Sequence, residues 1–397
     1  MSVEWNYVPF DSLFDWKEKS HIKSGDGKQA GKYKMFVCSD TEIKRFDEYI
    51  ESGESLVFGT GGKASCHFVD EKFAYSTDCV VAQKKKSDIC TKFYYYFLRQ
   101  NRLNSIQQTF TGGGLQHTSK KKIGALLVPV VDFETQKYIV AKIEELFSEL
   151  DNNTETLKNT KQQLAIYRQA VLKSAFEGHL TAQWRKQNNC LNSWKIDSIT
   201  NLIQTGNHSL KAGPFGSALK KECYVPTGYK IYGQEQVIAG NEEIGDYYIS
   251  KEKYQELITC KIAPKDVLIS LVGTIGKVLV LSDNCKDGII NPRLIKVSLD
   301  KEKMLPDFFK YYFESDYLRS LYKEKAHGAT MDVLNMGMIK ELPFAWCPVE
   351  EQHQVIKEIE SRFSICDNIE KTVNTTLQQA EAMRQSILKK AFEGELV

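Results

Sequence analysis

The sequence of 397 residues lacks the features that mark membrane and secreted proteins. It has no apolar run approaching the roughly 20 residues that a membrane-spanning helix requires. The first residues, Met1 to Pro9, lack the charged start and apolar core of a signal peptide. We therefore expect a cytoplasmic protein with no membrane association.

Metal-binding and catalytic signatures are also missing. The ten cysteines are scattered, and no two show the two-residue spacing of zinc sites. We interpret them as reduced and buried, and we expect no metal even where Cys66 and His67 are adjacent. The chain has no nucleophile elbow, no His-Glu-x-x-His sequence, no dinucleotide-binding glycine fingerprint and no acidic cluster for two-metal chemistry. These absences predict a chain without catalytic residues or a cofactor of its own.

A formal net charge of +2 does not identify a nucleic-acid-binding protein, but the lysines are clustered. Clusters in loops can contact phosphates while acidic residues elsewhere cancel the total charge. A solvated loop is the simpler interpretation of any single cluster, and that interpretation weakens when both halves carry one. The clusters lie at residues 17–34, 84–86 and 120–122 and at Lys211, Lys220 and Lys221.

What the chain does have is an internal repeat. Residues 134–180 align with residues 350–396 without a gap, at an offset of 396 − 180 = 216, and both copies close on Ala-Phe-Glu-Gly. This period is too long for a stacked solenoid repeat, so each unit should comprise a domain and a helix. The repeat predicts a pseudo-two-fold axis, which suits a two-fold partner such as duplex DNA with two half-sites.

Each copy of the repeat has the apolar periodicity of an amphipathic helix. About forty residues at 1.5 Å each predict a rod of roughly 60 Å. Asp132 can cap the first helix, Gly178 suits its end, and Pro348 precedes the second. Weak helix formers at Thr154, Asn159 and Thr160 and at residues 374–376 predict a kink or short break midway. We expect the two helices to pack on each other in antiparallel fashion.

The globular halves are related more distantly. Gly-Thr-Gly-Gly-Lys at residues 59–63 matches Gly-Thr-Ile-Gly-Lys at residues 273–277, and the aromatic residues within 93–97 match those within 309–313 at an offset of 216. Strand-like runs before the glycine motifs predict a hairpin or tight turn with the lysine at its tip. The aromatic residues are expected to pack a helix on the sheet rather than to stack bases.

Two motifs resemble known nucleotide-binding and base-binding motifs but lack the residues that those motifs require. The glycine motifs are not Walker A loops, because Val57 and Leu271 occupy the first glycine position and neither lysine precedes Ser or Thr. The sequence Asn291-Pro292-Arg293-Leu294 lacks the second proline and the aromatic ring with which amino-methyltransferases hold a flipped base. Both motifs therefore favour recognition over catalysis.

Taken together, these features resemble the specificity (S) subunit of type I restriction-modification enzymes. The resemblance covers essentially the whole chain and rests on the duplicated helix, on Gly-Pro-Phe-Gly-Ser at residues 213–217 and on Arg-Gln at residues 168–169 and 384–385. It implies an α+β fold in which two globular mixed α/β target recognition domains are separated by two long antiparallel coiled-coil helices. The domains would span residues 1–131 and 181–347, and the helices residues 132–180 and 348–397.

The resemblance implies a non-catalytic subunit that reads double-stranded DNA. Each target recognition domain would read half of an interrupted sequence, and the paired helices would act as a ruler. Two methyltransferase (M) subunits would dock around the helices, bind S-adenosylmethionine and methylate adenine. Restriction (R) subunits would use ATP and Mg to translocate and cut unmodified DNA, and this chain would bind none of these cofactors.

Candidate site residues follow from the motifs and the lysine clusters. Lysines should hold phosphates, whereas Gln116 can bond adenine and Arg293 can bond guanine in a bidentate way. Nothing between His21 and Asp40 matches the motif at residues 213–217. The DNA-binding candidates are Thr60, Lys63, Lys84, Lys85, Lys86, Gln116, His117, Lys120 and Lys121 in the first half and Lys211, Ser217, Lys220, Lys221, Thr274, Lys277, Arg293 and Thr330 in the second. The partner-binding candidates are Arg168, Gln169, Phe176, Arg384, Gln385 and Phe392.

Two other classes of function remain open from the residues alone. A stand-alone adenine methyltransferase with a degenerate motif at Asn291 would bind S-adenosylmethionine by itself. A structural tether that joins two protein partners would show no preference for any DNA.

Overall fold

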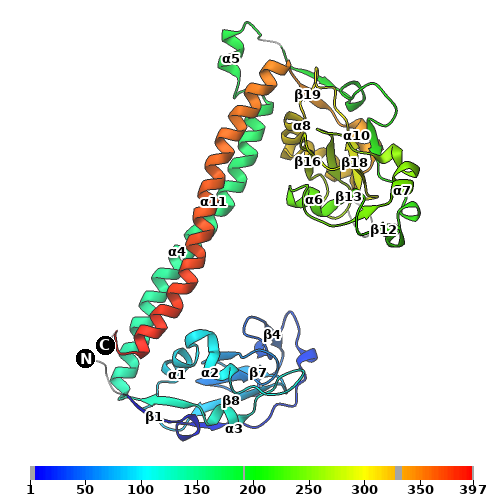
Figure 1. Cartoon of the computed structure of the whole chain (residues 1–397). Coiled ribbons are helices and arrows are strands. Elements are labelled where there is room, and N and C mark those ends of the chain that lie inside the picture. The colour runs from blue at the N-terminus through cyan, green and yellow to red at the C-terminus, as the bar shows by residue number, and fades with distance from the viewer. Residues whose placement is uncertain (1–4, 191–192, 327–332, 396–397) are drawn as a thin grey trace. The chain divides into compact units, whose positions relative to one another are not determined.

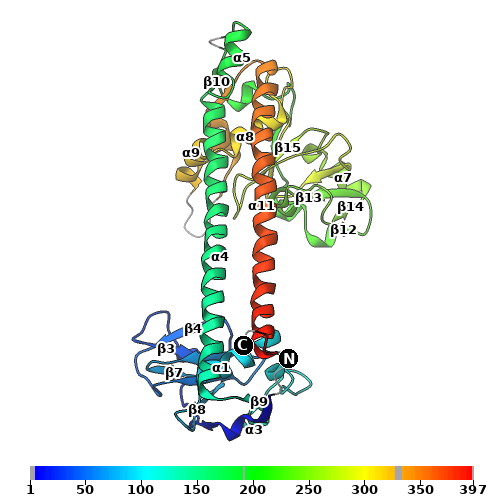
Figure 2. The same ribbon diagram turned by 90° about the vertical axis from the view of Figure 1, so that its left-hand side faces the viewer.

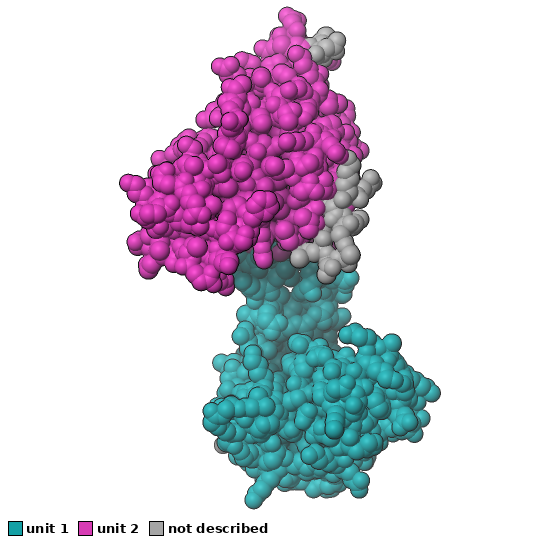
Figure 3. Space-filling model, turned by 90° about the vertical axis from the view of Figure 1, so that its right-hand side faces the viewer, with its two compact units in different colours: residues 1–159, 372–397 teal, residues 160–371 magenta. Residues whose placement is uncertain are grey.

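The computed structural model describes residues 5–190, 193–326 and 333–395 (Figure 1). The chain divides into two compact units, one of residues 1–159 and 372–397 and the other of residues 160–371 (Figure 3). Each unit holds one globular domain and a segment of both long helices, α4 (Phe133–Phe176) and α11 (Val349–Phe392). Each domain is therefore completed by the end of the helix from the other repeat.

The described part of the first unit contains three small sheets, one of which is the two-stranded pair β1-β9. A four-stranded antiparallel sheet has the order β2-β8-β5-β6, and a three-stranded sheet has the order β4-β3-β7 with β3 and β7 parallel. The strands are β1 (Asn6–Pro9), β2 (Phe14–Trp16), β3 (Tyr33–Phe36), β4 (Ile43–Phe46), β5 (Ser55–Gly59), β6 (Cys66–Val69), β7 (Phe73–Tyr75), β8 (Cys79–Lys84) and β9 (Leu127–Val130), the last paired with β1. The helices of the domain are α1 (Thr91–Leu98), α2 (Asn104–Gln107) and α3 (Lys120–Gly124).

The second unit repeats this topology. Its antiparallel sheet has the order β11-β18-β15-β16, and its other sheet has the order β12-β14-β13-β17 with β13 and β17 parallel. The strands are β10 (Lys195–Asp197), β11 (Leu210–Ala212), β12 (Tyr224–Val225), β13 (Tyr229–Tyr232), β14 (Tyr248–Ile249), β15 (Val267–Ser270), β16 (Val278–Val280), β17 (Gly288–Ile290), β18 (Leu294–Val297) and β19 (Phe344–Trp346), the last paired with β10. The helices are α5 (Ala182–Gln187), α6 (Gln234–Ala239), α7 (Lys251–Glu256), α8 (Pro306–Phe313), α9 (Asp316–Ala326) and α10 (Met336–Glu341).

The two glycine motifs are hairpin turns, as predicted, but only the first has its lysine within the turn. Lys63 lies between the paired residues Gly59 and Ser65, whereas Lys277 pairs with Ser270 at the base of the second hairpin. The first joins β5 to β6 and the second joins β15 to β16, and both strand pairs are antiparallel. In each unit the strand that enters the turn is flanked on both sides by other strands. Its side chains are therefore buried, and the turn projects from a fixed base.

The aromatic runs form equivalent helices, but their predicted alignment is wrong by one residue. The helices α1 and α8 each span eight residues and begin at Thr91 and Pro306, an offset of 215 rather than 216. The ring of Phe93 packs on Phe392, whereas the ring of Phe308 packs on Phe176. A run of adjacent aromatic residues matches itself in either register, so only packing against the long helices decides between them.

The long helices run without the predicted break. Both α4 and α11 are continuous over 44 residues. The hydroxyl of Thr154 donates to the carbonyl of Leu150 (2.8 Å), and that of Thr376 donates to the carbonyl of Thr372 (2.9 Å). These hydroxyl groups bond to the preceding helical turn, so low intrinsic propensity does not end the helix. The helices are long, but no helix within the described ranges is apolar enough over such a length to cross a membrane.

The predicted helix ends are confirmed. The backbone amide of Thr135 donates to the carboxylate of Asp132 at 2.9 Å, which caps the start of α4. Gly178 follows the last turn with φ of +78°, and the amide of His179 donates to the carbonyl of Ser174 at 2.9 Å. This left-handed glycine satisfies carbonyl groups that the helix end would otherwise leave without partners.

Within each unit the segments of α4 and α11 lie side by side and antiparallel (Figures 1 and 2). In the second unit, Arg168 Nη2 lies 2.7 Å from Asp367 Oδ1, and its guanidinium carbon lies 5.1 Å from the centroid of the Phe363 ring. In the first unit, Arg384 contacts Asp151 and lies 4.6 Å from the centroid of Phe147. The 216-residue offset relates these contacts one to one. The antiparallel pairing predicted from the repeat is confirmed.

A buried glutamine joins each long helix to its domain, and sequence reasoning missed both. The Gln136 side chain accepts a hydrogen bond from the amide of Cys90 at 2.8 Å, just before α1. The Gln352 side chain accepts one from the amide of Leu305 at 2.8 Å, just before α8. These two amides would otherwise be unsatisfied at a helix start, so each glutamine fixes the aromatic helix against the long helix.

Candidate nucleic-acid interface

In the first unit, the glycine turn meets the loop that carries Gln116. The amide of Gly62 donates to the carbonyl of Gln116, and the amide of Thr118 donates to the carbonyl of Thr60, both at 2.9 Å. The side chains of Lys63, Gln116 and His117 are exposed. The structure therefore brings together four of the predicted DNA-binding residues, Thr60, Lys63, Gln116 and His117.

The Cys38 side chain contacts the backbone of this turn and fixes its position. Sequence reasoning missed this residue. Its thiol lies 2.7 Å from the carbonyl oxygen of Gly61 and 3.1 Å from the amide nitrogen of the same residue. A side chain on Gly61 would meet the His117 ring, and Gly62 has φ of +75°. Glycine therefore allows two loops to approach closely here. No signal in the sequence links Cys38 to a turn more than twenty positions away.

The lysine run at residues 84–86 lies at the other end of the same strands. Gly59, beside the turn, pairs with Cys79, whereas Ser55 pairs with Gln83. Lys84 Nζ lies 2.7 Å from Glu54 Oε2. Burial raises the pKa of Glu54, but hydrogen bonds from Lys84 and Thr91 hold it below its ordinary value. The charge of Lys84 is thus offset within the domain.

The remaining basic candidates of the first unit have mixed surroundings. Lys85 Nζ donates to the carbonyl of Asp11 at 2.6 Å and lies 3.6 Å from the carboxylate of Asp15. Lys120 donates to the carbonyl of Lys17. Lys86 and Lys121 are exposed. Lys84, Lys85 and Lys120 are therefore bonded within the domain, whereas no such bond is seen for Lys86 and Lys121 in the described part of the chain.

In the second unit, three loops converge at one end of the sheet β11-β18-β15-β16. The amide of Gly213 donates to the carbonyl of Leu294 at 2.9 Å, and the amide of Leu271 donates to the carbonyl of Arg293 at 3.0 Å. A Cβ on Gly213 would lie 1.8 Å from the carbonyl oxygen of Asn291. These contacts bring the segments that carry Ser217, Thr274, Lys277 and Arg293 to the same edge.

A buried serine fixes the second glycine turn. Ser270 Oγ donates to the carbonyl of Thr274 at 2.5 Å and accepts from the amide of Lys277 at 3.1 Å. Its side chain is fully buried in an otherwise apolar strand. Ser270 is the single polar residue in this apolar strand. Because a buried polar side chain needs a hydrogen-bond partner, the sequence could have indicated that Ser270 holds the turn.

The basic candidates of the second unit are free of carboxylate partners in the part of the chain that the structure describes. By contrast, the buried Lys296 has its Nζ 3.7 Å from Asp266 Oδ2. Lys220, Lys221 and Arg293 are exposed, and Lys211 and Lys277 are half-buried. These five cations are therefore available to an external anion. Thr330, the remaining candidate, lies outside the described residues.

The six partner-binding candidates all make contacts within their own units. Gln169 accepts a hydrogen bond from the amide of Asp316 (2.9 Å), and Gln385 accepts one from the amide of Arg102 (3.2 Å). The Phe176 ring lies 4.9 Å from that of Tyr312. Phe392 likewise packs on the domain of its unit, whereas Arg168 and Arg384 contact the other long helix.

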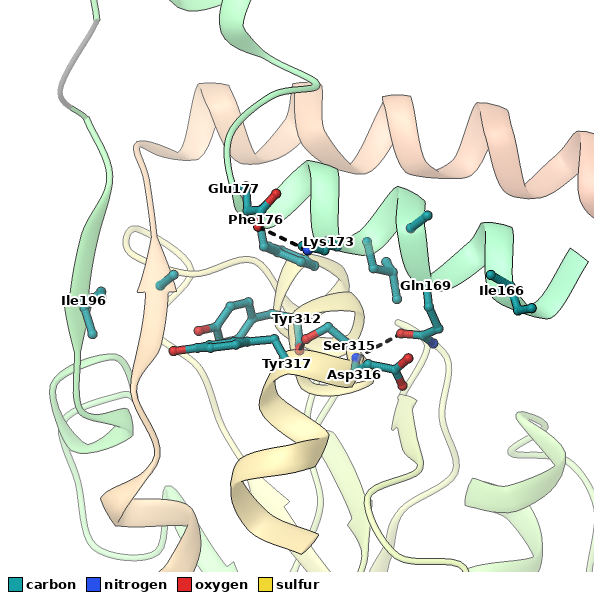
Figure 4. Close-up of a pocket in the computed structure, with 13 residues that line it drawn as sticks. Ile166, Gln169, Lys173, Phe176, Glu177, Ile196, Tyr312, Ser315, Asp316 and Tyr317 are labelled. Carbon is teal, nitrogen blue, oxygen red and sulfur yellow. Dashed lines mark hydrogen bonds and ion pairs between the residues drawn. The ribbon is translucent and has the colours of Figure 1, made fainter. Parts of the chain in front are cut away.

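An apolar groove lies beside the last turns of α4 in the second unit (Figure 4). It has a volume of about 680 Å³ and is lined by residues of α4, α8, α9, β10 and β19. Ile166, Ile196 and Tyr317 on its walls are 70%, 72% and 55% exposed. Exposed apolar side chains gathered around a groove are typical of protein contact surfaces. In the first unit, Tyr7 holds the strand position of Ile196 and is 50% exposed.

The cysteines were only partly predicted. All ten are free, but Cys38, Cys90, Cys190, Cys223 and Cys285 are half-buried rather than buried. Burial raises the pKa of Cys66 to about 12, so this thiol is inert. Its neighbour His67 is not a surface imidazole: it lies 2.7 Å from the carbonyl of Ser39, and burial lowers its pKa. In the described ranges, no three His, Cys, Asp or Glu residues form a group that could hold a metal.

The curated proteins that this chain resembles include specificity subunits of type I restriction enzymes. The Type I restriction enzyme EcoBI specificity subunit of Escherichia coli is 24% identical over 86% of this chain and 74% of its own length. The EcoKI specificity subunit of Escherichia coli strain K12 is 26% identical over 84% of this chain and 72% of its own. These relatives do not favour a stand-alone methyltransferase or a tether.

Solved structures share the fold. A structure from work on complex assembly and conformational transition of the type I R-M system has a TM-score of 0.72 at 14% identity, and covers 98% of this chain and 97% of its own. The HsdS subunit from Thermoanaerobacter tengcongensis has a TM-score of 0.52 at 15% identity, with the same coverage. Residues 2–165 and 215–379 each match the family described as the type I restriction modification DNA specificity domain. With a repeated topology and two such matches, this chain belongs to the type I restriction-modification DNA specificity family.

Proposed function

We propose that this chain is the DNA-reading subunit of a type I restriction-modification complex, and that each globular domain reads half of an interrupted target. One observation carries the proposal. Both units present a glycine hairpin turn at the same end of equivalent sheets, next to a second loop with exposed polar residues. A duplicated reading surface suits a DNA target with two half-sites.

The chemistry of the two surfaces supports DNA as the ligand. Lys63 in the first unit and Lys221 in the second have no carboxylate partner among the residues that the structure describes, so they can replace the counterions of DNA phosphates. Gln116 and Arg293 have the side chains that read adenine and guanine in the major groove. Both turns are held by a buried or half-buried side chain beneath them, Cys38 or Ser270. A fixed turn loses little conformational entropy on binding.

We further propose that two M subunits dock on the paired helices and that R subunits join the full complex. The apolar groove beside α4 provides a surface of the kind that a protein partner would cover. The continuous helices would fix the spacing between the half-sites. In this proposal S-adenosylmethionine, ATP and Mg belong to the partner subunits, this chain binds no cofactor, and the complex works in the cytoplasm, where its DNA lies.

The proposal is tested by the salt dependence of DNA binding. We expect Lys63→Ala and Lys277→Ala, in the complex with M subunits, to weaken binding to all sequences. Each should lower the slope of log affinity against log salt by about 0.9, because each removes one phosphate contact. Fluorescence anisotropy of a labelled duplex from about 50 to 200 mM salt measures this slope.

Matched controls separate phosphate contacts from general charge loss. Lys142 is paired with Glu145 at 2.8 Å, and Lys286 lies 3.8 Å from Glu243. Lys142→Ala and Lys286→Ala should leave the slope unchanged. An unchanged slope in the double variant of Lys63 and Lys277, in a complex of normal composition, would contradict the assignment of these turns to DNA.

A further inference from the structure

The most exposed large apolar side chain among the described residues is Phe215. It is 89% exposed, compared with 72% for Ile196 and 71% for Leu115. It lies in the Gly-Pro-Phe-Gly-Ser segment at residues 213–217, within the converging loops of the second unit. A phenylalanine this exposed gains almost nothing from folding, whereas burying it against a ligand would be favourable. The ring is therefore available for a contact outside its own domain.

The segment that carries Phe215 is held in place. Its carbonyl accepts a hydrogen bond from the amide of Ala218 at 2.8 Å, and Pro214 before it is buried. Gly213 packs so tightly on Asn291 that an added Cβ would lie 1.8 Å from the Asn291 carbonyl oxygen. The backbone on both sides of the ring is thus fixed. Phe215 is presented to solvent by a well-anchored turn and not by an open loop.

The surroundings of Phe215 favour a polyanion over a protein. Lys211, Lys220 and Lys221 lie within six positions of it in the chain, and Arg293 follows the residues on which Gly213 packs. None of these four cations has a carboxylate partner in the described part of the molecule. The neighbours of the ring, Gly216 and Ser217, are small, so a broad surface can approach it closely. An aromatic ring among unpaired cations matches the bases and phosphates of a nucleic acid.

We propose that Phe215 is a specificity-determining residue that enters a groove of the second half-site and makes an apolar contact with its bases. This inference rests on the proposed DNA-reading function. Phosphate contacts from the lysines carry no sequence information, whereas an apolar contact with bases does. Two base features can supply that contact: the methyl group of thymine, or a base step that opens to admit the ring.

The contact is confined to the second unit. After β11, the amide of Gly213 bonds to the carbonyl of Leu294 in β18 (2.9 Å); after β2, the equivalent amide belongs to Lys17 and bonds to the carbonyl of Val81 in β8 (2.8 Å). The chain beyond Lys17 buries its apolar Ile22, which is 5% exposed. The segment of residues 17–24 contains no Phe, Tyr or Trp, so the first unit has no equivalent of Phe215 at this place.

The test uses the full chain in complex with its M subunits. Binding is measured by anisotropy on the cognate duplex, on a duplex with the second half-site scrambled and on one with the first half-site scrambled. We expect Phe215→Ala to bind the cognate duplex about 5- to 150-fold more weakly. It should bind the duplex with a scrambled second half-site as the wild type does. Discrimination of the first half-site should be retained, and Phe215→Leu should recover part of the loss.

Two controls test whether the effect of Phe215→Ala comes from misfolding or from the loss of any exposed apolar side chain. Phe215→Ala should unfold at the wild-type temperature, because the side chain is almost fully exposed. Ile43→Ala removes an apolar side chain that is 46% exposed in the first unit and should leave all three affinities unchanged. Thymine-to-uracil substitution identifies a methyl contact, and 2-aminopurine fluorescence identifies an opened base step. A positive result from either probe, lost in Phe215→Ala, supports the inference.

Two results would overturn the inference and a third would overturn its basis. If Phe215→Ala keeps wild-type discrimination of the second half-site, Phe215 is not a specificity determinant. An equal loss on cognate and scrambled duplexes would show a nonspecific contact instead. If the wild-type complex itself does not distinguish cognate from scrambled DNA, the proposed function fails, and this outcome is separate from the other two.

Discussion

The two units share one topology but join their domains to the long helices differently. In the second unit, the fully buried carboxylate of Glu351 makes this junction. It accepts hydrogen bonds from Thr181, Arg185, Ser193 and Trp194 at 2.6 to 2.8 Å. In the first unit, the equivalent position is Thr135, whose backbone amide and hydroxyl both donate to Asp132 in the same helix turn.

The tryptophans at the start of the two domains show the same difference. Trp194 Nε1 donates to Glu351 at 2.8 Å, whereas the buried Nε1 of Trp5 has no hydrogen-bond partner among the described residues. Both rings still pack on the aromatic helix of their unit. The duplication has therefore kept the apolar packing of the junction, while its polar contacts have diverged.

The largest expected effect tests whether each phenylalanine serves the domain of the other repeat. Phe392 is 6% exposed and packs on Phe93 and Phe97 in the first unit. Phe392→Ala should destabilise that unit by about 3–5 kcal/mol, the usual cost of emptying a buried aromatic site. Scanning calorimetry should show a lower transition for the first unit only.

Phe176→Ala provides the matched change in the second unit. Its ring packs on Phe308 and Tyr312 but is only partly buried. We expect a smaller loss than for Phe392, and in the transition of the second unit alone. If either variant lowered both transitions equally, the division of the helices between the units would be wrong.

The next effect concerns the carboxylate at the junction of the second unit. Glu351→Gln leaves Arg185, whose side chain is 13% exposed, without its charge partner, and should cost about 3 kcal/mol. The matched control, Thr135→Val in the first unit, removes one exposed side-chain hydrogen bond to Asp132 and should cost about 1 kcal/mol. Thermal unfolding of both variants measures the difference. Equal effects would remove the distinction drawn between the two junctions.

The same carboxylate predicts a pH dependence. Burial raises the pKa of Glu351, but hydrogen bonds from Ser193, Arg185, Thr181 and Trp194 outweigh it and hold the pKa below its ordinary value. A lowered pKa in the folded state contributes stability that is present above the unfolded value, about 4.3, and is lost as the pH falls through the folded value. The second unit should therefore lose stability below about pH 4, and Glu351→Gln should reduce that loss.

A smaller effect is expected at the two base-reading candidates. Arg293→Ala should relax recognition at one base pair of the second half-site, and Gln116→Ala at one base pair of the first. Each should reduce discrimination by about 1–3 kcal/mol, because one bidentate contact is lost. Binding to duplexes with single base-pair changes measures this. A change in the opposite half-site would reverse the assignment of domains to half-sites.

The smallest effect should be at the ion pairs between the helices. Arg168 pairs with Asp367, whose side chain is 69% exposed, and Arg384 pairs with Asp151, which is 62% exposed. Exposed pairs of this kind contribute about 0.2–1 kcal/mol. Double-mutant cycles with Met and Asn should give similar small values in both units. A coupling energy several times larger in one unit would show that the two equivalent ion pairs do not contribute equally to stability.

The sequence predicted those parts of the fold that depend on local or repeated patterns. The cap at Asp132, the turn at Gly178, the two hairpins and the antiparallel helices all follow from periodicity, residue type or the duplication. It failed where a tertiary contact decides. The register of the aromatic helices depends on packing against Phe176 and Phe392, and the helices continue through weak helix formers because threonine hydroxyls bond to the preceding turn.

The site could be predicted only in part for the same reason. Motif order predicted the two glycine turns. Within the first unit the turn contacts the loop that carries Gln116, and within the second unit the segment that enters the turn contacts Arg293. Charge counting could not show that Glu54, thirty positions away, neutralises Lys84. Nor could it show that Phe215 stands exposed on a fixed turn. Which cations are free is a property of the folded chain.

We propose that this one chain carries two DNA-reading domains, each for a separate half-site. Mapping methylated adenines in the genome of cells that express this chain with its M subunit tests it most directly. The account predicts one interrupted motif with two defined halves, of which Arg293→Ala alters only one. A single uninterrupted motif, or methylation without sequence preference, would contradict it.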